Sequence, residues 1–256
     1  MPERRTASRI AKLTAVLHRL RASQLHWIEK VADALSSPSR FELLHRGLLD
    51  EISVFDFGDV LRIHHVFSAE PFTKDKFEYA LVQVLGWRGL EASLAAKGNP
   101  GHDATIAGSR VSFKTQADKS IRSDTIWISK FMELGKGTWG DNPSDLEPLR
   151  RAFLDHLQRY DRIFTLRALG KAPNWHYELV EIPKPLLGLA KNGELEMKLD
   201  SRQSPKPGYC HVRASDGTLL FQLYFDAGSE RKLQVKGLRK SQCVVHAEWQ
   251  FTVPLL

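Results

Sequence analysis

The stretch "HDATIAGSRVSFKTQ", residues 102–116, has an aspartate near its start and a lysine near its end. Alternating apolar residues on both sides of Ala-Gly-Ser predict two short strands joined by a turn. A turn centred near Gly108 would place Asp103 opposite Phe113 and diagonal to Lys114. We therefore expect the acid and the base to lie close together.

An acid and a lysine at this spacing suit the hydrolysis of phosphodiesters. Ser112 and Lys114 share the strand face turned away from Phe113, which we expect in the core. Asp103 and the backbone carbonyl of Phe113 would hold Mg²⁺ through oxygen atoms. Lys114 would position or deprotonate the attacking water and stabilise charge on the phosphate. The alternative is an ordinary cross-strand ion pair on a surface hairpin.

The same spacing resembles the signature of the PD-(D/E)xK nucleases, here "NPGHD" followed by "SFK". Longer blocks between about Ala95 and Phe251 resemble the SmaI-like type II restriction endonucleases of that group: "NPGHDATI", "SKFMELGKGTW", "YDRIFTLR", "YELVEIPKPLL", "QSPKPGY", "LYFDAGSERKLQVKGL" and "CVVHAEWQF". The resemblance implies a nuclease core, Mg²⁺ as cofactor and duplex DNA as substrate. It further implies the site CCCGGG, cut at its centre.

The chain departs from the signature at Ser112, where the family pattern usually has a second carboxylate. Two glutamates are candidates for the missing ligand. Glu78 borders the apolar stripe of a helix expected over Thr73–Leu85. Glu133 follows the strand that we expect to end at Ser129, and some restriction enzymes with serine at the acid position use a later glutamate. The sequence leaves both open as catalytic residues, with Glu78 slightly favoured as a metal ligand.

Hydrophobic periodicity predicts an α/β protein. Residues 1–60 show mainly helical spacing, with two helices before "SSPS" and a third holding Phe41, Leu44 and Leu48. Residues 61–190 alternate strands with helices, including a helix over Asp145–Tyr160, and residues 191–256 are β-rich with an Asp-Gly turn. We expect one nuclease domain over residues 1–256: a helical N-terminal region, a catalytic core with a mixed central sheet flanked by helices, and a β-rich DNA-reading region.

The charge of the chain favours a polyanionic partner. Its net charge is +7, and the excess lies at the two ends, where residues 1–35 carry 7 basic and 3 acidic residues and residues 201–256 carry 8 and 4. Phosphates attract such surfaces, and their binding releases counterions. Two cysteines exclude a disulfide scaffold, and no apolar run reaches the ~18 residues of a membrane span. We expect a cytoplasmic protein that does not bind membranes.

Two polar segments of the last quarter are candidates for reading DNA. In a G·C site, Arg or Lys donates to guanine and Asp, Glu or a carbonyl accepts from cytosine. The first segment is a loop stiffened by Pro205 and Pro207, and the second follows the "DAGS" sequence. Their candidate residues are Arg202, Gln203, Lys206, Glu230, Arg231, Lys232 and Gln234.

The leading hypothesis is a type II restriction endonuclease that acts as a homodimer, because a two-fold protein reads a two-fold site. A cognate DNA methyltransferase is implied in the host, although not as a bound partner. Two alternatives stay open. One is a monomeric nicking repair nuclease of the same fold, and the other is a DNA-binding protein with a vestigial site, which the serine at position 112 favours.

Overall fold

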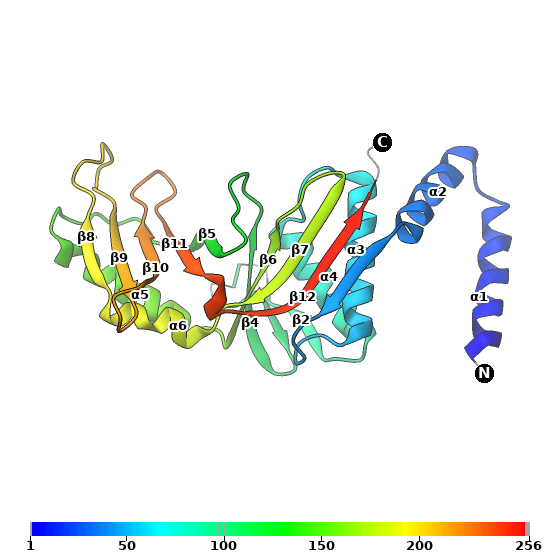
Figure 1. The fold of residues 1–256 in the computed structure, drawn as a ribbon, viewed down its shortest axis with the longest axis horizontal. Coiled ribbons are helices and arrows are strands. Elements are labelled where there is room, and N and C mark those ends of the chain that lie inside the picture. Colours follow the sequence, from blue (N-terminus) through cyan, green and yellow to red (C-terminus); the bar gives the residue numbers. More distant parts are fainter. Residues whose placement is uncertain (1, 97, 100, 254–256) are drawn as a thin grey trace.

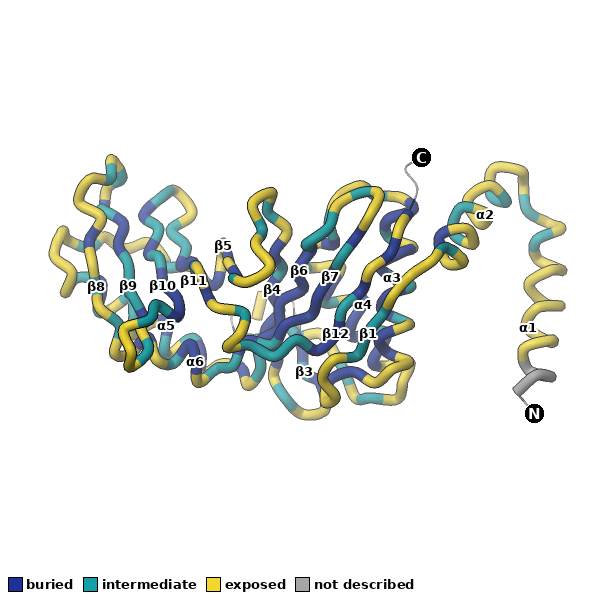
Figure 2. Tube along the Cα trace, in the orientation of Figure 1, coloured by how far each residue is buried: buried dark blue, intermediate teal, exposed yellow. Residues whose placement is uncertain are grey.

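The protein is described by a computed structural model that covers residues 2–96, 98–99 and 101–253, with side chains from residue 6 onward. Pro100 of the quoted motif lies outside the described residues. The molecule is elongated, with two sheets side by side and a helical arm that projects from one end (Figure 1). The arm consists of α1 (Pro2–Leu17) and α2 (Ala22–Ser36), which confirms the two helices expected before "SSPS". Apolar side chains of α1 such as Ile10 and Leu13 are exposed (Figure 2).

The third helix expected around Phe41 is wrong. Residues Ser39–Leu43 form strand β1, which pairs antiparallel with β12 (Val244–Thr252). Phe41 packs on α3 (Glu51–Phe67), a helix that the sequence analysis did not predict. A Cβ on Gly58 of α3 would collide with the Phe41 ring, so the glycine permits this approach. Pairing with a strand from the far end of the chain therefore outweighs the local helical spacing.

The first sheet has seven strands among the described residues, in the order β1-β12-β7-β6-β4-β3-β2. Strands β4 and β6 are parallel and the other neighbours antiparallel, which confirms a mixed central sheet. The remaining members are β2 (Ala92–Leu94), β3 (Ala104–Ile106), β4 (Ser109–Gln116), β6 (Arg162–Ala168) and β7 (Asn174–Glu181).

The second sheet has five strands in the described part of the chain, in the order β5-β11-β10-β9-β8. Its turn at Gly217, where φ is +82°, confirms the Asp-Gly hairpin predicted between β9 and β10. The β-rich prediction for the end of the chain is confirmed, although β12 returns to the first sheet. The members are β5 (Thr125–Glu133), β8 (Glu194–Met197), β9 (Gly208–Arg213), β10 (Leu219–Phe225) and β11 (Lys232–Arg239).

Helices cover both sheets and enclose two hydrophobic cores. Helices α3 and α4 (Lys74–Trp87) pack on one face of the first sheet, and α4 agrees with the predicted helix over Thr73–Leu85. The second core lies between the second sheet, α5 (Glu147–Leu157) and α6 (Lys184–Gly188). Short helical turns complete the connections: η1 (Pro143–Leu146), η2 (Leu189–Asn192) and η3 (Lys240–Gln242).

The two sheets are joined through the second core. The side chains of Ile163 in β6 and Val180 in β7 project from the face of the first sheet that is turned away from α4, and they pack among the residues of the second core. The alternation expected along β4 is also confirmed, because Val111 and Phe113 belong to the first core. Lys114 therefore faces the second sheet, between the two layers.

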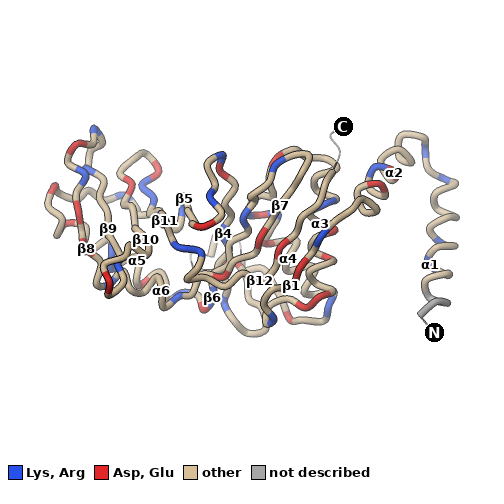
Figure 3. Tube along the Cα trace, in the orientation of Figure 1, with Lys and Arg blue, Asp and Glu red and all other residues tan. Residues whose placement is uncertain are grey.

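Basic residues lie along the helical arm and in the loops of the second sheet, at the two ends of the molecule (Figure 3). This distribution agrees with the uneven charge along the sequence. Of the described helices, none combines the length and the apolar character that crossing a membrane requires.

Candidate active site

The β3–β4 hairpin holds Asp103 beside β4. Its turn has two residues, Ala107 and Gly108, whose φ angles of +48° and +78° are typical of a tight type I′ hairpin. Ala104 therefore pairs with Val111, and the same register brings Asp103 beside Ser112 rather than Phe113, one residue away from the expected register. The expected proximity of the acid to β4 holds nonetheless.

Hydrogen bonds from β4 fix the Asp103 carboxylate. The backbone N–H of Phe113 donates to Asp103 Oδ2 over 2.6 Å, and the Ser112 hydroxyl donates to the same oxygen over 3.2 Å. Ser112 thus supports the aspartate from the position where the family pattern has an acid. One carboxylate oxygen is held by the strand, and Oδ1 points to another partner.

Lys114 lies almost completely inside the protein. Its residue surface is 9% exposed, and parallel pairing with β6 puts Thr165 next to it. The Nζ atom lies 5.3 Å from the centroid of the Phe131 ring, which belongs to β5. Burial lowers the pKa of Lys114 to about 8, although the nearby Asp103 carboxylate opposes the shift. A lysine with such a pKa can change its protonation state near neutral pH.

Helix α4 brings a second carboxylate to this site. The Phe77 ring packs on Phe113, with centroids 4.9 Å apart, and this contact sets the helix against β4. Lys74 and Glu78 lie on the same side of α4, four residues apart. Lys74 Nζ lies 2.8 Å from Asp103 Oδ1 and 2.6 Å from Glu78 Oε1. The structure therefore places Glu78 close to Asp103, with a lysine between them.

The pKa values of the two carboxylates shift in opposite directions. Burial would raise the pKa of Asp103, but hydrogen bonding to Lys74 and the charge of Lys114 outweigh it and lower that pKa. For Glu78, burial is the larger effect and raises the pKa despite the Lys74 ammonium. Asp103 is thus held as a carboxylate, whereas Glu78 gains a neighbouring cation without complete compensation for its burial.

The donor set at this site fits a hard divalent cation. Both carboxylates offer oxygen, as does the Phe113 carbonyl that the sequence analysis suggested. Glu78 Oε1 is buried and accepts no well-aligned hydrogen bond, since its contact with Lys74 is an ion pair of poor directionality. Within the described residues no three His, Cys, Asp or Glu side chains form a metal-binding group. An ion here would complete its shell with water, as Mg²⁺ commonly does.

Glu133, the other candidate for the missing acid, lies on a different part of the molecule. It is the last residue of β5 and not the start of a helix, its side chain is 70% exposed, and it pairs with Lys130 at 2.8 Å. Around it an open cavity is lined by Glu230 and Arg231, two candidate DNA-reading residues. Its contacts among the described residues are with this group and not with Asp103.

Helix α5, the turn that follows it and β6 add residues that the sequence analysis did not consider. Burial, together with the charge of Lys114, lowers the pKa of His156 to about 4. The hydroxyl groups of Tyr160 and Thr165 are buried and have no hydrogen-bond partner in the described structure. Nothing local in the sequence identifies these residues. Thr165 lies next to Lys114 only because β6 pairs with β4, and the charge of Lys114 acts on His156 because α5 packs against Phe131 of β5.

Comparison with known proteins decides the family. The model of the SmaI family, described as a type II site-specific deoxyribonuclease, matches residues 13–251. The chain belongs to this family. It is also 48% identical over 200 residues to the type II restriction enzyme SmaI of Serratia marcescens, a match that covers 77% of this chain and 79% of that enzyme. No solved structure matches the chain.

As a member of the SmaI family the protein is a type II site-specific deoxyribonuclease that acts on duplex DNA, and its second sheet bears the residues expected to read that DNA. Gln203 Nε2 donates to Asp226 Oδ1 over 3.4 Å, and Gln234 Nε2 donates to Asp226 Oδ2 over 3.2 Å. Trp127 Nε1 of β5 donates to Gln234 Oε1 over 3.2 Å. The structure thus joins the two predicted polar segments through an aspartate that the sequence analysis missed.

The other predicted DNA-reading residues lie around this network. Lys206 Nζ donates to the Ser201 carbonyl over 2.5 Å, and Arg202 is exposed in the same loop. Lys232 pairs with Glu230 at 3.1 Å. The Arg231 guanidinium lies 5.9 Å from the centroid of the Trp139 ring. Arg202 and Lys206 lie in the loop before β9, Glu230 and Arg231 in the loop before β11, and Lys232 begins β11, so all five lie near one end of the strands and none of them is buried.

One face of the second sheet combines aromatic and polar side chains, and we call it the polar face. It comprises Trp127, Tyr209, Tyr224, Gln234 and Lys236, which neighbouring strands bring together. Lys236 Nζ lies 3.7 Å from the Tyr224 ring centroid, 5.8 Å from that of Tyr209 and 5.9 Å from that of Trp127. The sequence analysis omitted Lys236, although its alternation with Gln234 and Lys232 along β11 placed it on the same face.

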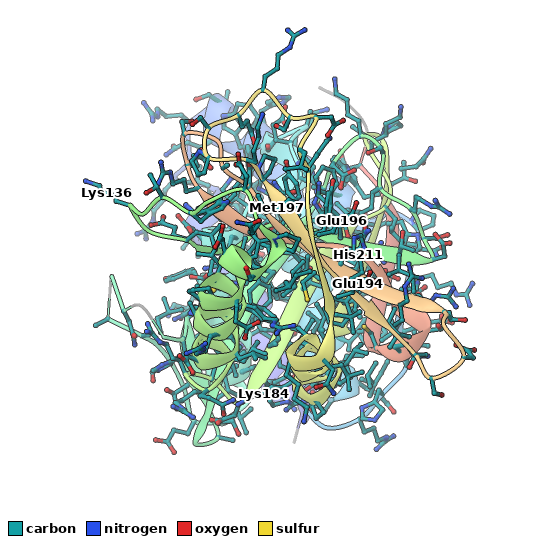
Figure 4. All side chains as sticks on the ribbon, turned by 90° about the vertical axis from the view of Figure 1, so that its left-hand side faces the viewer. Lys136, Lys184, Glu194, Glu196, Met197 and His211 are labelled. Atoms are coloured by element: carbon teal, nitrogen blue, oxygen red, sulfur yellow. The ribbon has the colours of Figure 1, made fainter. Side chains whose placement is uncertain are left out.

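The polar face continues to the outermost strand. His211 Nε2 lies 2.6 Å from Glu196 Oε2, and His211 Nδ1 lies 2.9 Å from Gln222 Nε2. Figure 4 shows Glu196 and His211 side by side, on the side of the sheet away from Lys136. The whole face is thus lined by hydrogen-bonding groups, while the opposite face packs into the second core.

Proposed function

We propose that the protein cleaves both strands of duplex DNA at a short G·C-rich palindrome, CCCGGG with a central blunt cut, in a reaction that depends on Mg²⁺. The observation that carries the proposal is the cluster of Asp103, Glu78 and Lys114 in a member of the SmaI family. We assign the mixed sheet to a restriction-endonuclease-like core, and what supports this assignment is that the β3–β4 hairpin carries Asp103 and Lys114 while the neighbouring helix α4 carries the second acid.

The site residues have distinct tasks in this reaction. Asp103, Glu78 and the Phe113 carbonyl would hold Mg²⁺, which when bound supplies Lewis-acid activation of the water and charge neutralisation at the phosphate. The Phe113 N–H keeps the Asp103 carboxylate oriented toward the site. Lys114, with a pKa near 8, positions the attacking water and takes its proton or, when charged, stabilises the phosphate. Burial between the sheets keeps the Lys114 side chain in one orientation.

The second sheet supplies the reading surface. Two segments lie at the same end of the second sheet: the loop around Gln203 and Lys206, and the turn before β11. Asp226 joins them through Gln203 and Gln234, and Gln234 belongs to the polar face. Lys236 and Arg231 are donors suited to guanine O6 and N7, whereas Asp226 and Glu230 are acceptors suited to the cytosine amino group. Glu133, which lines the same cavity as Arg231, belongs with this set in our proposal.

The protein would act as a homodimer in the cytoplasm of a host whose own sites a cognate methyltransferase protects. A palindromic site presents the same face twice, so a two-fold dimer reads it with one set of residues. Each subunit carries one Asp103–Lys114 cluster and would cut one strand.

Incubation of plasmid DNA with the protein and Mg²⁺ tests this function. Discrete linear fragments whose ends read CCC and GGG are expected, with no cleavage in EDTA. Lys114→Ala and Asp103→Ala should abolish cleavage while each variant still shifts the cognate duplex in a gel. Nicked circles alone would indicate a monomeric nicking nuclease, and a shift without cleavage by the wild-type protein would indicate a DNA-binding protein with a vestigial site.

A further inference from the structure

Lys74 occupies the position between the two carboxylates of the proposed metal site. Its ammonium group is 2.8 Å from Asp103 Oδ1 and 2.6 Å from Glu78 Oε1. The remaining oxygen of Asp103 is taken by the Phe113 N–H and the Ser112 hydroxyl. The two oxygens that face each other across the site therefore share one cation, which the protein itself supplies.

A divalent ion and this ammonium group require the same oxygen atoms. Mg²⁺ binds carboxylate oxygen at about 2.1 Å in octahedral geometry, which leaves no room for a second cation between the same two atoms. Charge leads to the same conclusion. Asp103 and Glu78 carry two negative charges, which Lys74 and Lys114 balance with two positive ones, so an added divalent ion would leave a large positive excess in a half-buried site.

We propose that Lys74 is a tethered counter-ion that holds Asp103 and Glu78 together in the metal-free enzyme and must leave them when the divalent cation binds. The inference rests on the proposed metal-dependent function and adds to it a competition between a side chain and the metal. Lys74 can move away from the two carboxylates, because its side chain lies in the first turn of α4, is 38% exposed and can rotate about four methylene groups. A DNA phosphate is the anion that the released ammonium would meet.

Competition of this kind weakens metal binding in the absence of DNA. The acids are preorganised by Lys74, but the metal must break two short ion pairs to reach them. In Lys74→Met the alkyl stem remains and the competing charge is gone. We expect its Kd for Mn²⁺, measured by calorimetry or electron paramagnetic resonance on the DNA-free protein, to fall by about tenfold or more, because a unit charge this close acts strongly in a half-buried site.

Lys76→Met is the matched control. Lys76 lies on the same turn of α4, is exposed, and its replacement removes the same charge from the neighbourhood. Its Kd for Mn²⁺ should change by less than about twofold, since exposed charges are screened. Equal tightening by both variants, or no tightening in Lys74→Met, would overturn the proposal.

Thermal unfolding gives a second readout that does not depend on activity. Lys74→Met and Lys74→Gln should each have a lower Tm than the wild type without metal, because two carboxylates lose their shared cation. Saturating Mn²⁺ should raise the Tm of each variant by more than it raises that of the wild type. A smaller rise in both variants would contradict the proposed competition.

Asp103→Asn separates this inference from the proposed function. If Mn²⁺ binding is lost in Asp103→Asn but unchanged in Lys74→Met, the metal site stands and the role of Lys74 is wrong. If Asp103→Asn binds Mn²⁺ as the wild type does, the metal site lies elsewhere, and both the proposed function and the competition fail.

Discussion

At the scale of single residues, the site shows which contacts short-range patterns can predict. The proximity of Asp103 to β4 follows from hairpin spacing, and the register error of one residue arises because the turn uses only Ala107 and Gly108. Glu78 could be predicted as a candidate because helical periodicity places it at the border of the apolar stripe of its helix. Lys74 was missed since its position depends on Asp103, which lies 29 residues away and meets it only in the folded protein.

Lys114 should lower the stability of the folded protein, because its charged side chain is buried. Its pKa is about 8 in the folded protein and 10.5 as an ordinary lysine, so burial of the charged group opposes folding. At pH 7 both states are protonated and the full cost is present. We expect Lys114→Met to raise the free energy of unfolding by ~1–3 kcal/mol at pH 7, a cost of function typical of active sites.

The pH dependence supplies the check on this prediction. Between about pH 8 and 10.5 the folded wild type loses the proton that the unfolded chain still holds, so wild-type stability rises relative to the variant. The gap in urea-unfolding free energy should therefore be largest below pH 8 and narrow above it. If Lys114→Met is less stable than the wild type at pH 7, the argument is wrong. Lys191→Met, at an exposed lysine, is the control for the removal of a charge alone.

At the scale of elements, β5 links the proposed cleavage site to the proposed reading surface. The pairing of β5 with β11 shifts between Leu233 and Val235, which marks an irregularity in the strand. Within the irregular stretch of β5, between Ile128 and Met132, Phe131 packs against Lys114. Before that stretch, Trp127 donates to Gln234 of the polar face. Irregularities of this kind redirect side chains next to active sites. Strand propensity alone predicted β5 but could not locate the shift.

Lys236 offers a test of the polar face. Its ammonium group is held above Tyr224 and flanked by two more rings, so little side-chain entropy is lost when it meets a base. We expect Lys236→Met to weaken binding of the cognate duplex by about 10- to 100-fold, the range of a good guanine contact, and to weaken random duplex much less. Competition binding at one fixed salt concentration measures both.

Arg231→Ala is a second test of DNA reading, and Lys191→Met is the control. Arg231 lies in the loop directly before β11, and its replacement should also weaken binding of the cognate duplex more than binding of a random duplex. Lys191, exposed on η2 against the opposite side of the second sheet, should have no effect on either duplex. Equal losses on cognate and random duplexes for Lys236→Met would assign the lysine to phosphate contact, with a reduced salt slope.

At the scale of the whole molecule, long-range pairing decides the architecture. Strand β12, near the end of the chain, lies between β1 and β7, and a sequence read in order cannot foresee that insertion. Arg167 of β6 then ties the layers together. It forms a fully buried ion pair with Glu178 and donates to the carbonyls of Arg122 and Thr125, where the chain passes from the first sheet to the second. The α/β class was predictable, but β1, α3 and this connection were not.

A double-strand cut by this protein should require two chains. Each chain carries one cluster of Asp103, Glu78 and Lys114, whereas a duplex has two strands of opposite polarity. If two chains bind the palindrome about a two-fold axis, each cluster meets one scissile bond. A dimer with one wild-type and one Lys114→Ala subunit, isolated through two different affinity tags, should bind the site normally and convert supercoiled plasmid to nicked circles. Both homodimers serve as controls, one giving linear DNA and the other none. Linear product from the mixed dimer at the wild-type rate would show that one subunit cuts both strands, and a monomeric mass for the active species on DNA would exclude the dimer.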